Sequence, residues 1–117
     1  MNRRFRLASS SDFKRVRQSG KAHAHSLVVL HTAPSGLAST RLAVSAGRSL
    51  GSATVRNRAK RRLREAARPH LASIPPGWDL ILVARAPLAR ASWPEVQEAV
   101  AAVLRRARLI TDDRRRA

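Results

Sequence analysis

The hydrophobic positions of this 117-residue chain recur at two spacings, one helical and one strand-like. The clearest helical segment begins after Gly51, where Ser52 can act as a hydroxyl cap. It is predicted to end near Pro69, because proline disfavours helical geometry in the residue before it. The apolar side chains that gather on one face of this segment are Val55, Ala59, Leu63, Ala66 and Ala67. The sequence therefore predicts a long amphipathic helix in the middle of the chain.

Two further helices are predicted from spacing and end signals. Near the carboxyl end, Ser92 and Glu95 have the spacing of a capping box, with Pro94 in the first turn. The apolar residues that follow at helical spacing are Val96, Val100, Val103, Leu104 and Ala107. A shorter helix is predicted from about Ser10 to Gln18, closed by Gly20.

Branched apolar residues mark the strands. The segment 26–32 is predicted to be a strand that stops at the turn 34–36, and the segment 20–24 adds a shorter strand before it. The segment 41–46 alternates apolar with small or polar positions, so it is predicted to pair with 26–32 through the intervening loop. Residues 79–85 follow a Pro-Pro-Gly turn and form an almost continuous apolar run, as expected of an interior strand.

The element order is thus helix, three strands, helix, strand, helix. Because these elements must bury their apolar faces against one another, the order predicts an α+β fold. We expect a two-layer α/β sandwich with a mixed sheet of about four strands and three helices. The length suits a single domain over residues 1–117, with a basic lead-in at 1–8 and a frayed tail at 111–117.

The charge balance narrows the function. The chain has 24 Lys and Arg against 7 Asp and Glu, which gives a formal net charge of +17. The positive side chains repel one another in a free monomer, and a polyanion would neutralise them. Nucleic acid is therefore the expected partner. No cysteine is present, which excludes disulfides and thiolate zinc sites and fits a reducing cytoplasm.

A membrane surface is the competing polyanion. The apolar runs are far shorter than the roughly 20 residues that span a bilayer. Serine, aspartate and lysine interrupt the basic amino-terminal segment before an apolar signal core can form. We therefore expect a cytoplasmic protein with neither a membrane partner nor a secretion signal.

The long central helix carries the densest group of cations. Its flank holds Arg56, Lys60, Arg64 and Arg68, with Asn57 and Arg61 beside them. Guanidinium groups bind phosphate oxygens through paired hydrogen bonds, so nucleic-acid phosphates fit this flank. For such a run taken alone, a solvated arginine face is the simpler alternative.

Residues for catalysis or metal binding are not grouped in the sequence. The four histidines are scattered, and they are His23, His25, His31 and His70. The seven carboxylates lie mostly at helix starts or in the tail, and Ser9 with Asp12 resembles a capping box. We therefore expect no metal site and no catalytic residue in the protein, although His23 and His25 share one side of an extended segment.

Aromatic side chains that could stack on RNA bases are few, namely Phe5, Phe13, Trp78 and Trp93. Phe13 on the first helix is the best candidate for a base or sugar contact, with a place in the core as the alternative. Trp78 and Trp93 flank the last strand and are expected to pack.

The stretch from Arg48 to Arg64 resembles the arginine-asparagine-arginine motif of bacterial ribonuclease P protein subunits. The motif residues are Arg56-Asn57-Arg58, followed by Lys60-Arg61 and Arg64-Glu65. The resemblance extends over nearly the whole chain. The other matching segments fall in the family's order, and they are Asp12-Phe13-Lys14-Arg15-Val16 before Gly20, Leu27 to Thr32, Arg41 to Ser45, and Asp79 to Arg85.

This resemblance implies a small basic protein that joins a catalytic RNA, the ribonuclease P RNA. Together they remove the 5′ leader from precursor tRNA by Mg²⁺-dependent phosphodiester hydrolysis. The RNA performs the chemistry and binds most of the Mg²⁺, and DNA is not an expected partner. The resemblance also implies a left-handed crossover through the arginine-rich helix, against the usual right-handed rule.

Carried over by position, the resemblance implies two sets of RNA contacts. The ribonuclease P RNA would be bound by Arg48, Arg56, Asn57, Arg58, Lys60, Arg61 and Arg64. The single-stranded leader would lie in a cleft between the sheet and the flanking helices, near Phe13, Arg17, Val29 and His31.

Three positions depart from the family pattern. Arg17 stands where a second aromatic often follows, and His31 stands where tyrosine is common, so leader contacts are expected to be more electrostatic. The loop around Arg48 has fewer cations than usual, and Arg41 or Arg90 is a candidate to compensate.

Three other functions use some of the same features. A ribosomal or other structural RNA-binding protein fits the composition, and only the ordered motif disfavours it. A helix-turn-helix DNA-binding protein is disfavoured because strands separate the helices. A protein-only nuclease would cleave precursor tRNA without an RNA subunit, which the scattered carboxylates do not favour.

Overall fold

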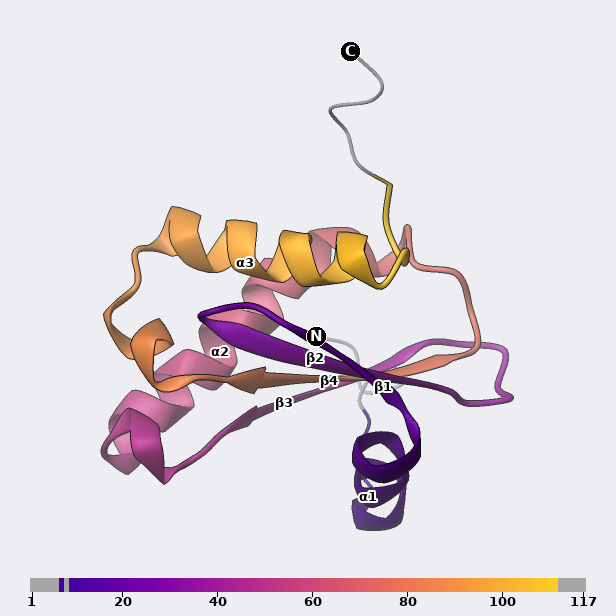
Figure 1. Cartoon of the computed structure of the whole chain (residues 1–117), viewed down its shortest axis with the longest axis horizontal. Coiled ribbons are helices and arrows are strands. Elements are labelled where there is room, and N and C mark those ends of the chain that lie inside the picture. Colours follow the sequence, from indigo (N-terminus) through magenta and orange to yellow (C-terminus); the bar gives the residue numbers. More distant parts are fainter. Residues whose placement is uncertain (1–6, 8, 112–117) are drawn as a thin grey trace.

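The computed structural model describes residue 7 and residues 9–111 (Figure 1). The helices are α1 (Ser10–Ser19), α2 (Ala53–Leu71) and α3 (Trp93–Arg106), and the strands are β1 (Lys21–Ala24), β2 (Val28–Pro34), β3 (Arg41–Ala46) and β4 (Trp78–Ala84). Two short 3-10 turns, η2 (Arg48–Leu50) and η3 (Ala86–Arg90), precede α2 and α3. The predicted order of three helices and four strands is confirmed. Phe5, most of the predicted lead-in and nearly all of the tail lie outside the described residues.

The four strands form one mixed sheet in the order β1-β2-β4-β3. β4 lies in the interior of the sheet, as its apolar run predicted. It runs antiparallel to β2 and parallel to β3. The predicted pairing of 26–32 with 41–46 is therefore wrong, because β4 lies between these segments. β4 buries side chains on both faces and β3 buries fewer, so hydrophobic burial favours the interior place for β4.

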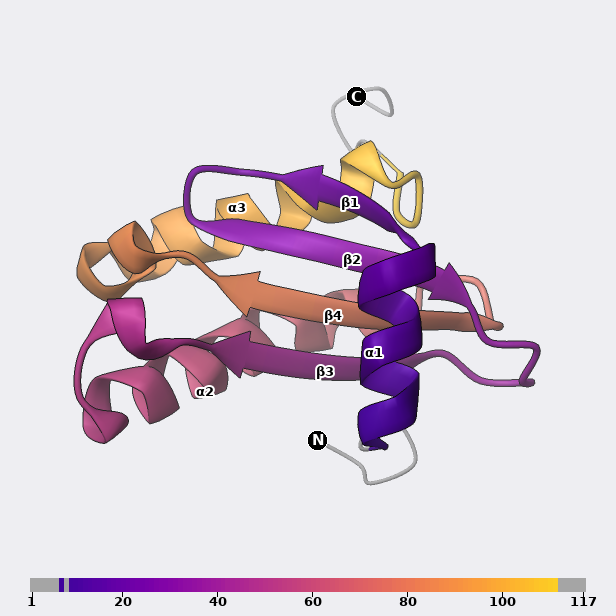
Figure 2. The same cartoon turned by 60° about the horizontal axis from the view of Figure 1, so that its bottom comes forward.

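The connection from β3 through α2 to β4 joins two parallel neighbours and is left-handed. Figure 2 shows both strands running in the same direction, with β3 at the lower edge, β4 above it and α2 behind the sheet. Most such connections are right-handed. The handedness implied by the family resemblance is confirmed.

The helices cover the two faces of the sheet unequally. α2 and α3 pack on one face and complete the two-layer sandwich, whereas α1 crosses the opposite face (Figures 1 and 2). The larger core lies between the sheet and the two long helices, and includes Leu30, Leu63, Leu82 and Val100, all without exposed surface. A smaller hydrophobic cluster lies under α1. Val16 is the one residue of α1 that is buried. Apolar contacts alone therefore hold α1 weakly.

Capping follows the sequence at two of the three helices. The Ser52 hydroxyl accepts a hydrogen bond of 3.4 Å from the amide of residue 55 at the start of α2. At α3 both bonds of the capping box form, from the Glu95 amide to the Ser92 hydroxyl at 3.3 Å and from the Ser92 amide to the Glu95 carboxylate at 2.8 Å. The capping box predicted at α1 is wrong, because the Ser9 hydroxyl pairs with that of Ser11.

The ends of α1 and α2 also follow from single residues. α2 continues two residues past Pro69 and ends at Leu71, because proline near the last turn removes only one backbone donor. Gly20 closes α1, as predicted. A Cβ at Gly20 would overlap the backbone oxygens of Thr32 and Val16, so glycine permits the close approach of α1 to β2.

Candidate RNA-binding surfaces

The residues predicted to contact the catalytic RNA form a strip on the outer side of α2, continued by η2. We call this strip the basic ridge, and its members are Arg48, Arg56, Asn57, Arg58, Lys60, Arg61 and Arg64. The opposite side of α2 is buried in the larger core through Ala59, Leu63, Ala66 and Ala67. Four members of the ridge are exposed, and Arg56, Lys60 and Arg64 are half-buried. The helix period thus separates the packing side chains from the cationic ones.

Within the described part of the chain, no residue of the basic ridge makes an ion pair. Glu65 is the one carboxylate in the sequence of α2, and its oxygen lies 3.4 Å from Arg68, outside the ridge. The buried Nε of Arg56 has no hydrogen-bond partner among the described residues. The fold therefore leaves the donors of the ridge available to an external anion.

Arg62 is an exception among the cations of α2, and the sequence pattern did not single it out. Its guanidinium donates to the carbonyl oxygens of Ala91 at 2.7 Å and of Leu88 at 3.4 Å. Burial, and to a lesser extent the nearby charge of Arg58, lower the pKa of Arg62. Arg62 lies about 40° around the helix from Arg58, so helical spacing alone does not separate it from the ridge, and only the contact with η3 distinguishes it. It ties α2 to η3 and to the start of α3.

The residues predicted for the leader lie on the face of the sheet that α1 crosses (Figure 2). Val29 and His31 alternate with the buried Leu30 along β2, and both are half-buried. Phe13 packs partly against the small cluster under α1, and Arg17 is exposed on the same helix. Burial and the nearby charge of Arg17 lower the pKa of His31, so near pH 7 Arg17 carries the charge there. The structure brings these four residues to one face, opposite α2.

A buried carboxylate fastens α1 to this face. Asp79 on β4 has no exposed surface and accepts two hydrogen bonds of 2.8 Å from Arg41 on β3. Arg15 on α1 donates to the same carboxylate, and also to the carbonyl of Pro34 at 3.0 Å. Asp12 on α1 completes the network at 3.3 Å from Arg41. The hydrogen bond to Asp79 is the main cause of a raised pKa of Arg41.

This network corrects two interpretations of the sequence. Arg41 is held by carboxylates in the sheet and cannot supplement the loop around Arg48, whereas Arg90 is exposed on η3. Helix capping explains Glu95 but not the buried Asp79. The sequence signal for this network was Asp79, a single carboxylate near the start of an apolar strand. A buried charge requires a cationic partner, so this position predicts an ion pair inside the fold.

Known proteins share both the sequence and the fold. The family model described as Ribonuclease P matches residues 1–108. A ribonuclease P protein component from Herpetosiphon aurantiacus is 43% identical over 112 residues, covering 96% of this chain and 91% of the relative. The RNase P protein structure from Staphylococcus aureus superposes with a TM-score of 0.84 at 29% identity, covering 92% of this chain and 98% of that one. The structure from Thermotoga maritima gives 0.77 at 30% identity, covering 86% and 96%.

The chain belongs to the ribonuclease P protein family. It is an RNA-binding protein of tRNA processing, the protein component of a ribonucleoprotein endoribonuclease whose partner is the ribonuclease P RNA.

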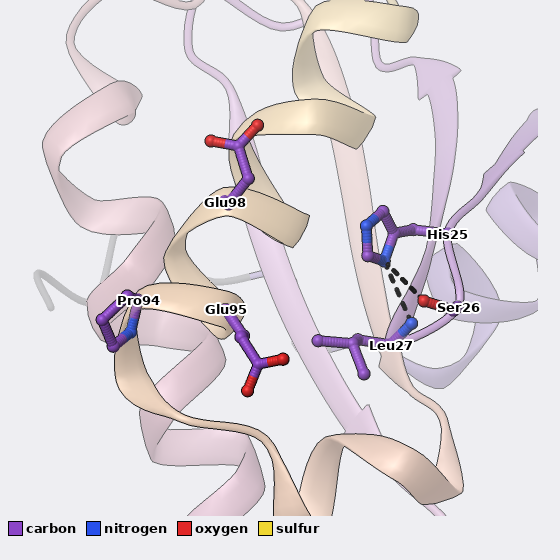
Figure 3. Close-up of a pocket in the computed structure, with 6 residues that line it drawn as sticks. All are labelled: His25, Ser26, Leu27, Pro94, Glu95 and Glu98. Carbon is purple, nitrogen blue, oxygen red and sulfur yellow. Dashed lines mark hydrogen bonds between the residues drawn. The ribbon is translucent and has the colours of Figure 1, made fainter.

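Other residues of this ribonuclease P protein form a hollow of about 410 Å³. Figure 3 shows its lining, made of His25, Ser26 and Leu27 near the β1–β2 turn and Pro94, Glu95 and Glu98 on α3. The His25 Nδ1 accepts a hydrogen bond of 3.0 Å from the Leu27 amide, which fixes the ring. Two carboxylates line the hollow and one of them, Glu98, pairs with Arg105 at 2.6 Å, so this hollow suits phosphate less well than the ridge does.

Neither a metal cluster nor a membrane span is found in the described ranges. Residue 7 and residues 9–111 contain no group of three His, Asp or Glu side chains that could hold a metal ion. No helix among them is both long enough and apolar enough to cross a bilayer.

Asp79→Asn is expected to destabilise the protein by about 3–5 kcal/mol, because it leaves two arginines around a neutral buried amide. Urea unfolding measures this loss. Glu65→Gln is the control, since its ion pair with Arg68 is exposed and is expected to change stability by less than about 1 kcal/mol. Equal stability of the two variants would contradict the anchoring role of Asp79.

Proposed function

We propose that the basic ridge binds the ribonuclease P RNA while the α1 face of the sheet binds the 5′ leader of precursor tRNA. The protein thereby assists the Mg²⁺-dependent removal of the leader that produces the mature 5′ end. One observation carries the proposal: among the described residues the ridge has no ion pair, although Arg15, Arg41, Arg68 and Arg105 elsewhere in the fold are paired with carboxylates.

The ridge suits a folded RNA because its cations are closely spaced on one rigid helix. Each guanidinium can form two parallel hydrogen bonds with a phosphate, and each contact releases condensed counterions. Affinity for the RNA is therefore expected to fall steeply with salt.

The leader surface suits a single strand. Arg17 supplies a positive charge beside the neutral ring of His31, and Phe13 offers a partly exposed aromatic ring on the same helix. The sheet separates this surface from the ridge, so the protein can hold two RNA segments at once. A cationic body between two polyanions lowers their mutual repulsion, and less Mg²⁺ is then needed to bring them together.

The described residues do not fit a protein-held Mg²⁺ site. Asp12 and Asp79 are paired with arginines in the sheet network, and Glu65 and Glu98 are paired with Arg68 and Arg105. Within residue 7 and residues 9–111, no cluster of carboxylates remains for the metal. We propose that the RNA binds the catalytic Mg²⁺, and that the protein binds both RNA segments and positions the leader.

Reconstitution with the ribonuclease P RNA from the same organism tests the proposal. At low Mg²⁺, added protein should raise kcat/KM for precursor tRNA, and protein without RNA should not cleave. RNA binding with no effect on cleavage would indicate a structural RNA-binding protein instead. The proposal fails if the protein neither binds that RNA nor improves leader removal.

Arg58→Glu combined with Arg61→Glu should weaken binding of the ribonuclease P RNA by roughly a hundredfold and lower the magnitude of the salt slope by about 1.5–2, because two phosphate contacts are lost. Filter binding over a salt series measures both. The control is Lys21→Glu with Arg108→Glu, two exposed cations on β1 and after α3 that give the same change of charge. If both double variants bind alike, net charge and not the ridge determines affinity.

Arg17→Glu should weaken binding of leader-bearing precursor tRNA to the reconstituted holoenzyme by about tenfold, equal to about 1.4 kcal/mol, and leave binding of mature tRNA unchanged. The reason is that the leader alone would meet Arg17. Lys21→Glu is the matched control, because residue 21 pairs with Thr32 and lies on the other face of the sheet from His31. Equal losses for precursor and mature tRNA would place Arg17 outside the leader surface.

A further inference from the structure

Trp93, in the first turn of α3, is an exposed aromatic residue that the functions above do not use. Its exposed fraction is 39%, and Leu37 is the one other large hydrophobic residue exposed to that degree in the described part of the chain. Packing beside the last strand was expected for both tryptophans; Trp78 packs against the larger core, and Trp93 keeps part of its surface exposed. A single exposed aromatic residue is not by itself evidence of a binding site, so its surroundings decide what it can do.

The backbone on both sides of Trp93 is rigidly held. The Ser92–Glu95 capping box and Pro94 fix the first turn of α3. Just before it, the Ala91 carbonyl accepts a hydrogen bond of 2.7 Å from Arg62 on α2. The backbone that carries the indole is thus fixed in place and fastened to the helix that carries the basic ridge.

The helix period places Trp93 apart from the carboxylates of α3. Residues 93, 100 and 104 share one stripe, and Val100 and Leu104 are buried in the core that α2 and α3 share. Glu95 and Glu98 lie about 140–160° away around the helix and line the hollow beside His25 and Leu27 (Figure 3). The indole and the acidic hollow therefore occupy different sides of α3.

Cations without carboxylate partners occur on the elements that meet at the start of α3. Arg58, a ridge residue, is close enough to Arg62 to lower the pKa of the latter. Arg90 is exposed three residues before Trp93. Neither Arg58 nor Arg90 makes an ion pair within the described residues, and Arg62 is bonded to carbonyl oxygens alone. An exposed indole that lies near such cations in the chain suits an unpaired nucleotide, whose base can stack while its phosphates bind the cations.

We propose that Trp93 stacks on an unpaired base of the ribonuclease P RNA, with Arg58 and Arg90 binding the flanking phosphates. This inference rests on the proposed function of the ridge and extends the RNA contact from α2 to η3 and α3. An apolar protein partner at the start of α3 would leave these cations desolvated and unpaired, which is unfavourable.

Fluorescence tests the stacking directly, because the chain has two tryptophans. In the Trp78→Phe protein, emission comes from Trp93. Binding of the ribonuclease P RNA should quench this emission and protect the indole from acrylamide. Unchanged emission with full acrylamide accessibility in the complex would overturn the proposal.

Affinity provides the second test. Trp93→Ala should weaken binding of the ribonuclease P RNA roughly five- to hundredfold with an unchanged salt slope, because a stacked base and not a phosphate contact is lost. Trp93→Phe should retain most of the affinity, and Leu37→Ala, which removes the other exposed apolar side chain, should retain all of it. If Trp93→Ala binds the ribonuclease P RNA as tightly as the unsubstituted protein does, the proposed stacking is wrong. Arg61→Glu alone, which leaves Trp93, Arg58 and Arg90 intact, then tests the role of the ridge separately. Should the alanine variant fail to fold, the Phe variant and the quenching experiment still decide.

Discussion

The chain has seven carboxylates for twenty-four Lys and Arg side chains, so the position of each carboxylate decides which cations remain unpaired. Asp12 and Asp79 join Arg15 and Arg41 in the sheet network. On α2 and α3, Glu65 and Glu98 pair with arginines of their own helices, and Glu95 caps a helix. None of these five reaches the basic ridge. In the proposed complex RNA phosphates would relieve the resulting repulsion along α2, so the same charges that destabilise the free chain would stabilise the complex.

Arginine therefore has two roles in this fold. Arginines with a partner inside the protein hold the structure together, and those without one are available to an external anion. Arg15, Arg41 and Arg62 are held by Asp79 or by backbone carbonyls, and they fasten α1 and η3 to the rest of the molecule. The ridge arginines have no such partners in the described residues. Because α1 buries little apolar surface, the face proposed to bind the leader depends on the charged network around Asp79 more than on hydrophobic packing.

Features that depend on nearby residues could be predicted from the sequence. The extent of α2, its Ser52 cap and the separation of its apolar and cationic sides follow from helical spacing, and the interior position of β4 follows from its apolar run. Features set by distant parts of the chain could not. The insertion of β4 between β2 and β3 depends on the competition for burial among whole strands. The pairing of Asp79 with Arg15 joins residues 64 positions apart. The exposure of Trp93 depends on how α3 starts relative to α2, which the order of elements does not specify.

The central claim is that RNA covers the unpaired side of α2 and not the acidic side of α3. Because the chain contains no cysteine, a single one can carry a tethered iron chelate that cleaves nearby RNA. Asn57 lies on the ridge and Ser26 borders the acidic hollow, and both are exposed. In the reconstituted holoenzyme, the probe on Asn57→Cys should cut the ribonuclease P RNA at discrete positions, and the probe on Ser26→Cys should not. Cleavage from position 26 with none from position 57 would contradict the account.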